Sequence, residues 1–364
     1  MPAIRGFIPA LFVFSTAIAL ADTPGIVSTQ FLNGENPTTP SCHASTIEET
    51  PNGLLAAWFG GAHENNPNVG IWVVRNINER WTTPVEIANG VQYARTNGGV
   101  HRHPTWNPVL FQYPNGPLML FYKCGPSPRT WWGMVMSSAD CGETWTTPVR
   151  LPEHIDGPVR NKPILLNDGT LLCGSSTEYD GWRVHFEFTQ DHGATWQRTA
   201  AVGSEKKMEA IQPTFLRHPS GRIEALCRNR DGNARILTTS SADSGKTWTK
   251  LKETSLPNPG SGIDAVTLRD GRHLLIYNHT NRSGTKPRGR EMLNVSVSDD
   301  GVTWKAAAIL DNEQQSEFSY PAVIQSSDGT VHVTYTWKRK LIRYVRIDPA
   351  RLVLKPYDGN QWPF

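Results

Sequence analysis

An eight-residue motif of the form S/T-x-D-x-G-x-T-W returns at nearly even spacing along the chain. Intact copies occupy residues 138–145, 189–196 and 241–248, and a degenerate fourth copy at 297–304 begins with Val297. The tryptophans that end these copies are 51, 52 and 56 residues apart, and a remnant of the motif ends at Trp81. Repeats of this length are typical of four-stranded β-propeller blades, so the motif favours a circular repeat fold.

The residue types of this motif, which we call the Asp-box, suit the turn of a β-hairpin. An aspartate carboxylate can accept hydrogen bonds from backbone N–H groups in a turn, and glycine adopts a positive φ without steric penalty. The closing tryptophan can pack between neighbouring sheets. We therefore expect the motif aspartates to be structural rather than catalytic; they are Asp140, Asp191, Asp243 and, in the degenerate copy, Asp299.

A second periodic signal is independent of the first. Pairs of apolar runs are separated by short turns that end in glycine, at residues 52–53, 115–116, 168–169, 220–221, 270–271 and 328–329. Each pair is typical of a two-stranded hairpin. Six such turns predict six blades. The fold class predicted from the sequence is thus all-β, a six-bladed β-propeller with Asp-box repeats.

Charge excludes two classes of partner. The chain carries 36 Lys and Arg against 33 Asp and Glu, and its basic residues are spread without a run. Binding to nucleic acid or to a membrane surface usually requires a basic stripe or patch. We therefore expect neither of these partners, and we expect the protein to be a monomer.

The first residues have the pattern of a secretory signal peptide. Arg5 supplies a positive charge, residues 7–20 are apolar, and Ala19-Leu20-Ala21 offers a cleavage site before Asp22. Residues 1–21 are thus expected to be removed on export, which leaves 22–364 as a single propeller domain.

Two further features agree with a secreted, extracellular protein. N-glycosylation sequons lie at Asn278, Asn281 and Asn294. Five cysteines are consistent with one or two disulfides and at least one free thiol.

The innermost strands of a propeller converge on its axis, where they can present side chains to a ligand. Four of the six repeats align through a proline that follows a polar residue, and the other two align by position. Six polar residues at equivalent positions favour a binding pocket over apolar packing, with a hydrogen-bonded plug of the tunnel as the alternative. The predicted ring consists of His43, Asn107, Lys162, Gln212, Asp264 and Tyr320.

Loops at the same end of the blades contribute further polar residues. Several are arginines, and arginine binds carboxylates through two parallel hydrogen bonds. The pocket is therefore expected to take a glycan or another small anionic ligand, such as a uronic or sialic acid. The flanking candidates are His63, Glu64, His101, Arg102, His103, Arg160, Arg228, Arg230, Arg288, Arg290 and Glu317.

The chain resembles the sialidase (neuraminidase) superfamily, particularly its BNR or Asp-box proteins, over almost all of residues 40–347. Besides the Asp-boxes, the likeness rests on five short segments: Cys42-His43-Ala44-Ser45, Trp106-Asn107-Pro108-Val109, Asn161-Lys162-Pro163-Ile164, Gly262-Ile263-Asp264 and Phe318-Ser319-Tyr320-Pro321. Sialidases bind the substrate carboxylate with three arginines, attack with a tyrosine paired to a glutamate, and protonate with an aspartate.

Carried over by position, the resemblance implies roles for several residues. Tyr320 corresponds to the nucleophile, Arg228 to the second arginine, and Arg288 or Arg290 to the third. The chain departs from the pattern elsewhere: His43 stands where the first arginine is expected, and Gln212 where the glutamate is expected. The acid/base loop offers His63, Glu64 and Asn68 instead of a clear aspartate.

Two enzymatic mechanisms and one non-enzymatic function are compatible with these residues. A glycoside hydrolase could use Tyr320 with Glu317 or Asp264, and Glu64 as acid. A polysaccharide lyase could remove a uronate proton with His43 or Tyr320 while Lys162, Asn107 or Gln212 neutralises the carboxylate. A glycan-binding propeller without activity, or a propeller reused for other small-molecule chemistry, is the third possibility. None of these functions requires a cofactor, and no CxxC or HxxxH spacing indicates a metal site.

Overall fold

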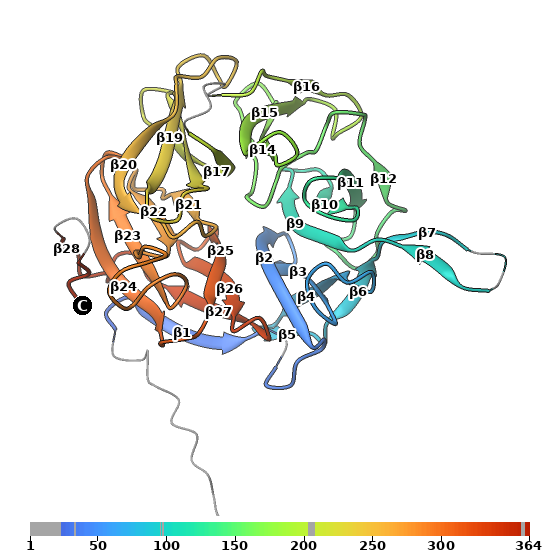
Figure 1. The fold of residues 1–364 in the computed structure, drawn as a ribbon, viewed down its shortest axis with the longest axis horizontal. Coiled ribbons are helices and arrows are strands. Elements are labelled where there is room, and N and C mark those ends of the chain that lie inside the picture. The colour runs from blue at the N-terminus through green and yellow to red at the C-terminus, as the bar shows by residue number, and fades with distance from the viewer. Residues whose placement is uncertain (1–22, 33, 95, 97, 203–207, 358–360) are drawn as a thin grey trace, which may run out of the picture.

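The computed structural model describes residues 23–32, 34–94, 96, 98–202, 208–357 and 361–364. Within these ranges every regular element is a β-strand. The strands form six sheets of four or five strands and one separate two-stranded hairpin. Figure 1 shows the six sheets arranged as blades around a central axis. The predicted six-bladed β-propeller is therefore confirmed.

The first three blades each begin with their innermost strand. Blade 1 contains β2 (Ser41–Thr50), β3 (Gly53–Gly61), β4 (Gly70–Ile77), β5 (Arg80–Trp81) and β6 (Val85–Ala88). Blade 2 contains β9 (Thr105–Gln112), β10 (Leu118–Cys124), β11 (Trp132–Ser138) and β12 (Val149–Arg150). Blade 3 contains β13 (Ile164–Leu165), β14 (Leu171–Thr177), β15 (Arg183–Thr189) and β16 (Gln197–Arg198).

The last three blades follow the same plan. Blade 4 contains β17 (Ala210–Arg217), β18 (Ile223–Asn229), β19 (Arg235–Ser241) and β20 (Lys252–Pro257). Blade 5 contains β21 (Asp264–Thr267), β22 (His273–Tyr277), β23 (Met292–Ser298), β24 (Trp304–Asn312) and the C-terminal β28 (Lys355–Pro356). Blade 6 contains β25 (Phe318–Gln325), β26 (Val331–Trp337), β27 (Leu341–Ile347) and β1 (Ile26–Phe31).

An N-terminal strand closes the circle. β1 pairs antiparallel with β27, so that Ile26 faces Ile347 and Phe31 faces Arg343. Blade 6 is thus built from segments near both ends of the chain, which joins the last blade to the first. The separate hairpin, β7 (Val91–Ala94) with β8 (Val100–Arg102), connects blades 1 and 2 and projects from the rim (Figure 1).

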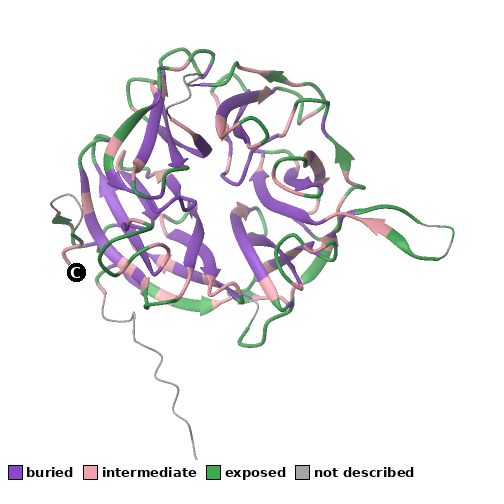
Figure 2. Cartoon of the chain, viewed as in Figure 1, coloured by how far each residue is buried: buried purple, intermediate pink, exposed green. Residues whose placement is uncertain are grey.

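Apolar side chains fill the spaces between neighbouring blades, so the strands are buried over most of their length (Figure 2). Leu274 and Val333 belong to a cluster that joins blades 5 and 6, and Leu55 and Leu110 to one that joins blades 1 and 2. Full burial of such a side chain contributes about 1.5–3 kcal/mol. The core is therefore distributed around the ring, as expected for a repeat architecture.

The three intact Asp-boxes have the predicted turn geometry. Asp191 Oδ1 accepts hydrogen bonds from the Thr195 N–H (2.8 Å) and the Thr189 hydroxyl (2.9 Å), and Gly193 has a φ of 90°. Asp140 and Asp243 accept the equivalent bonds. The side-chain and backbone bonds from Thr195 hold the pKa of Asp191 at about 2. These aspartates are engaged in their own turns, as the sequence predicted.

The fourth Asp-box corrects the sequence assignment. Asp300, and not Asp299, accepts hydrogen bonds from the Thr303 N–H (2.6 Å) and from the Ser298 hydroxyl (2.9 Å). Asp299 is instead exposed, with a salt bridge to Lys305. The fourth Asp-box is therefore one residue shorter than the other three. It begins at Ser298, whose hydroxyl takes the place of the Ser or Thr hydroxyl that begins the other boxes.

We expect Asp300→Asn to lower the melting temperature by a few degrees at neutral pH, and Asp299→Asn to leave it nearly unchanged. Burial opposes ionisation of Asp300, but bonds from Thr303 and Val302 outweigh it and hold the pKa at about 2. Since this pKa is depressed on folding, the stabilisation is present above pH ~4 and is lost as pH falls toward about 2. Thermal unfolding from pH 7 to pH 2 would check this, and an equal loss in both variants at pH 7 would contradict it.

Several sequence expectations concern modification and export. The expectation of disulfides is wrong, because all five cysteines are free, and Cys42, Cys124, Cys173 and Cys227 are buried on four different blades. Two sequons, at Asn278 and Asn294, have fully buried side chains, which leaves Asn281 as the more accessible one. The predicted signal peptide, 1–21, lies outside the described residues. No helix long and apolar enough to cross a membrane occurs in the described part.

Candidate functional site

The innermost strands of four blades carry a β-bulge at the same place. The bulged pairs are Ala44-Ser45, Asn107-Pro108, Gln212-Pro213 and Tyr320-Pro321. The first residue of each pair has a positive φ, of 54°, 42°, 56° and 53° respectively. Each lies nine positions before the turn glycine of its blade. Bulges bend a strand and re-aim a side chain, and a non-glycine residue with positive φ is held there only by its surroundings.

The nine-residue spacing also identifies the equivalent residue in the other two blades. Arg160, with a φ of 74°, precedes Gly169 by nine positions, and Gly262 precedes Gly271 by nine. The predicted ring was therefore misaligned in three blades. His43 lies one residue before the bulge, and Lys162 and Asp264 lie two residues after the ring position. The structurally equivalent set is Ala44, Asn107, Arg160, Gln212, Gly262 and Tyr320.

Tyr320 is the centre of a cluster of arginines. Arg228 donates a hydrogen bond from Nη1 to the Tyr320 hydroxyl at 2.6 Å. The Cζ atoms of Arg160 and Arg290 lie 5.1 Å and 5.2 Å from the centroid of the tyrosine ring. Contacts of this kind are attractive because the ring face is electron-rich. Three blades thus direct guanidinium groups at one buried phenol.

These charges change the acidity of the phenol. Burial alone would raise the pKa of Tyr320, but the charges of Arg228 and Arg290 outweigh it, and a hydrogen bond from Gln212 acts in the same direction. Glu64 opposes them. The pKa of Tyr320 therefore lies below its ordinary value, which makes the phenolate easier to form.

His43 packs against the same tyrosine. The two ring centroids are 4.0 Å apart, and His43 Nδ1 lies 2.9 Å from the Thr336 hydroxyl. Burial lowers the pKa of His43 well below its usual value, and the nearby arginines, Arg339 first among them, lower it further. His43 is therefore a neutral, 1% exposed residue that supports the tyrosine ring.

A second layer of charge surrounds this cluster. Glu317 accepts hydrogen bonds from Arg290 (2.7 Å) and Arg339 (2.9 Å), and Arg339 also pairs with Glu64. The structure thus brings the candidates Glu64, Glu317 and Arg290 together. It adds Arg339, which lies in the turn after β26 and matched no motif. Its only sequence signal is its position in an Arg-Lys-rich turn at the ligand end of blade 6.

Arg228 differs from Arg290, whose charge is paired with Glu317. Among the residues that the structure describes, neither Arg228 nor Arg160 has a carboxylate within ion-pair distance. Arg160, however, donates to the carbonyls of Ile263 and Pro321, whereas Arg228 donates only to Tyr320 and weakly, at 3.4 Å, to Gln212. An uncompensated, buried guanidinium is a ready anchor for a substrate anion.

Lys162 and Asp264 form the base of the site. Lys162 Nζ donates to Asp264 Oδ2 and to the Ala265 carbonyl, both at 2.8 Å. Asp264 also accepts from the Thr214 hydroxyl (2.7 Å) and the Val323 N–H (2.8 Å). Groups from four blades therefore meet in one polar network. This part of the ring resembles the hydrogen-bonded plug of the tunnel that was the alternative to a binding pocket.

The remaining predicted residues are less closely connected to Tyr320. Arg230 forms a bidentate salt bridge with Glu209, at 2.8 Å and 2.7 Å. His63 bonds within its own loop, to the Glu64 carbonyl, and His103 packs against Trp132. Asn107 is buried at the ring position of blade 2. The structure therefore separates the cluster around Tyr320 from an outer group of loop residues.

Two residues near Arg228 were missed by sequence reasoning. The Trp182 ring lies beneath the Arg228 guanidinium, with its centroid 4.7 Å from Cζ. Glu178, in the loop after β14, has its pKa raised by burial, although Arg228 counteracts this. A partly buried carboxyl with raised pKa beside an anion site is a candidate proton donor. Neither residue belongs to a repeat motif, so periodicity could not identify it.

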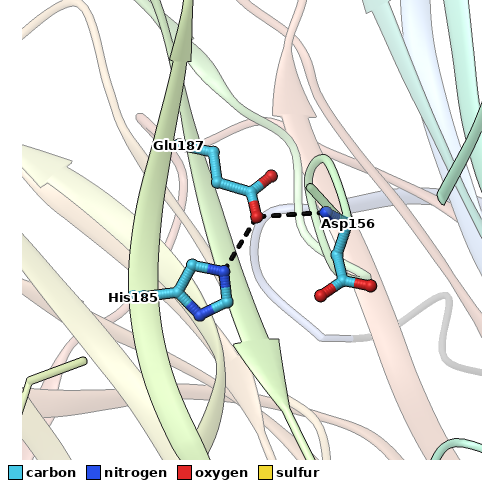
Figure 3. Close-up of side chains that lie close together, drawn as sticks. All are labelled: Asp156, His185 and Glu187. Carbon is cyan, nitrogen blue, oxygen red and sulfur yellow. Dashed lines mark hydrogen bonds and ion pairs between the residues drawn. The ribbon is translucent and has the colours of Figure 1, made fainter. Parts of the chain in front are cut away.

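One group of side chains in the described residues has metal-ligand character. Oxygen and nitrogen atoms of Asp156, His185 and Glu187 lie within 4.8 Å of one another (Figure 3). Glu187 already accepts bonds from the N–H groups of Asp156 (3.1 Å) and Gly157 (2.6 Å), and from His185 (2.8 Å). Both oxygens of Glu187 are thus already engaged in hydrogen bonds within the protein, which does not favour a metal ion.

Comparison with known proteins adds a family match and more distant relatives. The BNR repeat-like domain model matches residues 52–333. A sialidase of Bacteroides fragilis (strain YCH46) is 26% identical over 241 residues, which cover 57% of this chain and 42% of that protein. The chain therefore spans less than half the length of this curated relative.

Two solved structures share the fold. A protein of unknown function from Dyadobacter fermentans superimposes with a TM-score of 0.69 at 18% identity, over 92% of this chain and all of that one. The Hadza microbial sialidase Hz136 has the same TM-score at 19% identity, over 86% of this chain and 67% of that one. At these identities the likeness concerns the fold, and residue roles have to be argued from the site.

Proposed function

Because the chain belongs to the BNR repeat-like domain family, we propose that it is a secreted, sialidase-like glycoside hydrolase that releases a terminal acidic sugar. Its substrate is a glycan whose end residue carries a carboxylate. Tyr320 is the nucleophile, and Arg228 and Arg290 bind the carboxylate, with Arg339 beside them.

The observation that carries this proposal is the hydrogen bond from Arg228 to the Tyr320 hydroxyl. It places the uncompensated guanidinium and the acidified phenol 2.6 Å apart. A sugar whose carboxylate pairs with Arg228 would therefore present its anomeric carbon close to the phenolic oxygen. A tyrosine nucleophile is an accepted alternative to a carboxylate in glycoside hydrolysis.

The residues also suggest how the phenol is activated without a carboxylate base. Gln212 stands where a glutamate base would be expected, and an amide cannot accept the phenolic proton. The arginine charges lower the pKa of Tyr320, and Gln212 contributes a hydrogen bond. We infer that the phenol loses its proton to solvent water and that electrostatic stabilisation of the resulting phenolate replaces a dedicated base.

Protonation of the leaving group is assigned to Glu178. We expect Glu178→Gln to lower kcat on an unactivated glycoside by about 100-fold, the usual contribution of a general acid. A nitrophenyl glycoside should be nearly unaffected, because its leaving group needs no proton. Burial raises the pKa of this acid, so wild-type kcat should fall as pH rises through that pKa, and the variant should lose this dependence.

Glu64→Gln is the matched comparison, because Glu64 is a neighbouring carboxylate that is ion-paired with Arg339. It should weaken substrate binding without dependence on the leaving group. A leaving-group-dependent loss in Glu64→Gln, with none in Glu178→Gln, would transfer the acid role to Glu64.

Product analysis on a panel of glycosides tests the function itself. The panel contains sialosides, terminal glucuronides and galacturonides, acidic polysaccharides and neutral β-galactosides. Release of a saturated acidic monosaccharide, with neutral glycosides untouched, is expected. An unsaturated product absorbing in the ultraviolet would indicate a lyase and overturn the proposal, as would the release of neutral sugars alone.

A further inference from the structure

The loop that enters the axis from blade 3 is held by a buried ionic cluster, and we infer that this cluster positions the catalytic tyrosine from across the propeller. The loop consists of residues 156–162, which belong to the segment that connects β12 to β13. The cluster consists of Lys123, His185 and Glu187. The inference rests on the proposed function for its catalytic consequence, but its structural part can be tested without activity.

Three consecutive residues of the loop reach three other blades. Arg160 donates to the backbone carbonyls of Pro321 in blade 6 and Ile263 in blade 5. Asn161 Nδ2 donates to the Gln212 carbonyl in blade 4 at 2.9 Å. Lys162 pairs with Asp264. The loop thus contacts the backbone at or beside both Tyr320 and Gln212.

The contact with Pro321 matters because it lies next to the strained position. Tyr320 has a φ of 53°, a conformation that costs a tyrosine about 1–3 kcal/mol and that neighbouring contacts must maintain. Arg160 holds the carbonyl one residue further on, and its guanidinium lies 5.1 Å from the tyrosine ring centroid. Both the backbone and the ring of the tyrosine are therefore fixed by one side chain.

The start of the loop is fixed in turn by the buried cluster. Glu187 accepts hydrogen bonds from the N–H groups of Asp156 and Gly157. Its third bond comes from His185, and Figure 3 shows the bonds from Asp156 and His185. Lys123 Nζ donates to the Pro158 carbonyl at 3.0 Å. Glu187, His185 and Lys123 are all fully buried. Three consecutive loop residues are thus clamped by charged groups from blades 2 and 3.

The charges explain why this is a clamp and not a metal site. Burial lowers the pKa of Lys123 to about 8, partly offset by Asp156 and Glu187. The lysine therefore supplies the positive charge that these carboxylates require. A metal ion would have to compete with a cation already in place and with the two loop N–H groups on Glu187.

Hydrogen exchange of the variants tests the clamp. The proteins are wild type, Glu187→Gln, Arg160→Met and the double variant, and the readouts are the peptides that cover 156–162 and β25. We expect Glu187→Gln to speed exchange in both peptides at least about fivefold. In the Arg160→Met background, adding Glu187→Gln should speed exchange in the loop but not further in β25, because the connection is already cut.

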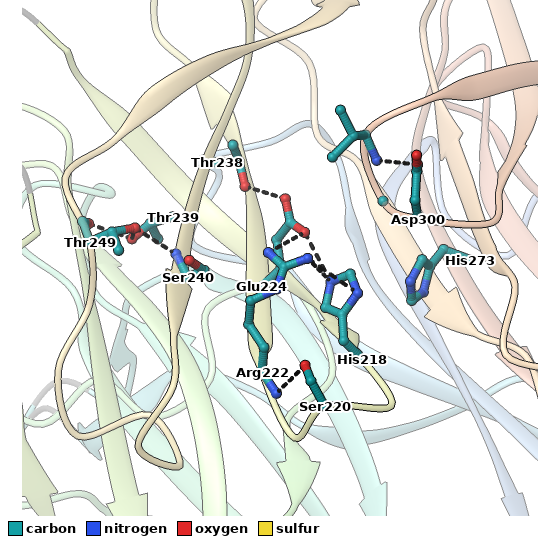
Figure 4. Close-up of polar contacts among 12 residues, drawn as sticks. His218, Ser220, Arg222, Glu224, Thr238, Thr239, Ser240, Thr249, His273 and Asp300 are labelled. Carbon is teal, nitrogen blue, oxygen red and sulfur yellow. Dashed lines mark hydrogen bonds and ion pairs between the residues drawn. The ribbon is translucent and has the colours of Figure 1, made fainter.

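Glu224→Gln is the matched control. Glu224 is also a buried carboxylate, bonded to His218 (3.0 Å), Arg222 (3.2 Å) and Thr238 (2.7 Å), as Figure 4 shows. It lies on β18 near the turn that joins β17 and β18, and none of these bonds reaches loop 156–162. It should loosen its own blade while exchange in β25 stays as in wild type. Lys123→Gln is the second clamp variant if Glu187→Gln does not fold.

The outcomes separate this inference from the proposed function. Where the panel shows hydrolysis, Glu187→Gln should lower kcat at least about tenfold with KM nearly unchanged, and Glu224→Gln should not. Where the panel shows none, the proposed function fails and the exchange experiment still decides on the clamp. Loosening confined to 156–162, or additive effects of Glu187→Gln and Arg160→Met on β25, would overturn the inference.

Discussion

Tyr320→Phe should lower kcat by at least about 100-fold on the released acidic glycoside, with little change in melting temperature. Phenylalanine keeps the ring that packs on His43 and beneath Arg160, so the apolar contacts remain. Only the hydroxyl that accepts the bond from Arg228 is lost. The substitution should therefore slow the chemical step without destabilising the fold. Steady-state kinetics, measured together with thermal unfolding, would distinguish a loss of catalysis from a loss of stability.

Substrate binding provides the internal control for this variant. KM, or the affinity for the free acidic sugar, should change little, because the arginines that bind the carboxylate stay in place. Arg228→Met should show the complementary pattern, with weakened binding as well as reduced turnover. Near-wild-type kcat in Tyr320→Phe would remove the nucleophile assignment and favour a binding propeller.

The largest effect on stability is expected from Asp264→Ala. Its carboxylate, 1% exposed, accepts hydrogen bonds from Lys162, Thr214 and the Val323 N–H, so it joins blades 3, 4 and 6 to blade 5. Removing one partner of a buried ion pair leaves the other charge uncompensated. Such changes typically destabilise by about 3–5 kcal/mol.

Urea unfolding of Asp264→Ala beside Asp270→Ala would check this expectation. Asp270 pairs with Arg272 at a half-exposed turn of the same blade, and such surface pairs contribute about 0–1 kcal/mol. If both variants unfold at the same urea concentration, the polar network on the axis does not hold the blades together.

The blades themselves could be predicted from the sequence, because each repeat carries its own local turn signals. An Asp-box aspartate and a turn glycine act within a few residues, so their roles do not depend on the rest of the fold. The exception supports this explanation. In the fourth box the bonds come from Asp300, because one missing residue in the turn shifted the register of the motif.

The ring was harder to predict, since proline is a poor marker of equivalence. Pro163 follows Lys162, but the positive-φ residue equivalent to the bulged positions is Arg160 in blade 3, and no proline follows it. The spacing of nine residues between the ring position and the turn glycine is the same in all six blades. Counting back nine residues from Gly169 would have identified Arg160.

Arg339 and Glu178 could not be predicted by either signal. Both lie in loops at the ligand end of the blades, whose lengths and sequences differ between repeats. Arg339 meets Glu317 because β25 and β26 pair within blade 6, and Glu178 lies near Arg228 because blades 3 and 4 are neighbours. Neither proximity follows from a repeat motif.

The most direct test of the account is mass spectrometry of the protein after reaction with a slow substrate. The reagent is the acidic sugar that the panel identifies, with fluorine beside the anomeric carbon to slow hydrolysis of a covalent intermediate. We predict one added sugar on the peptide that contains Tyr320, and none in Tyr320→Phe. Inactivation with the sugar on a different residue, or full turnover without any covalent species, would contradict it.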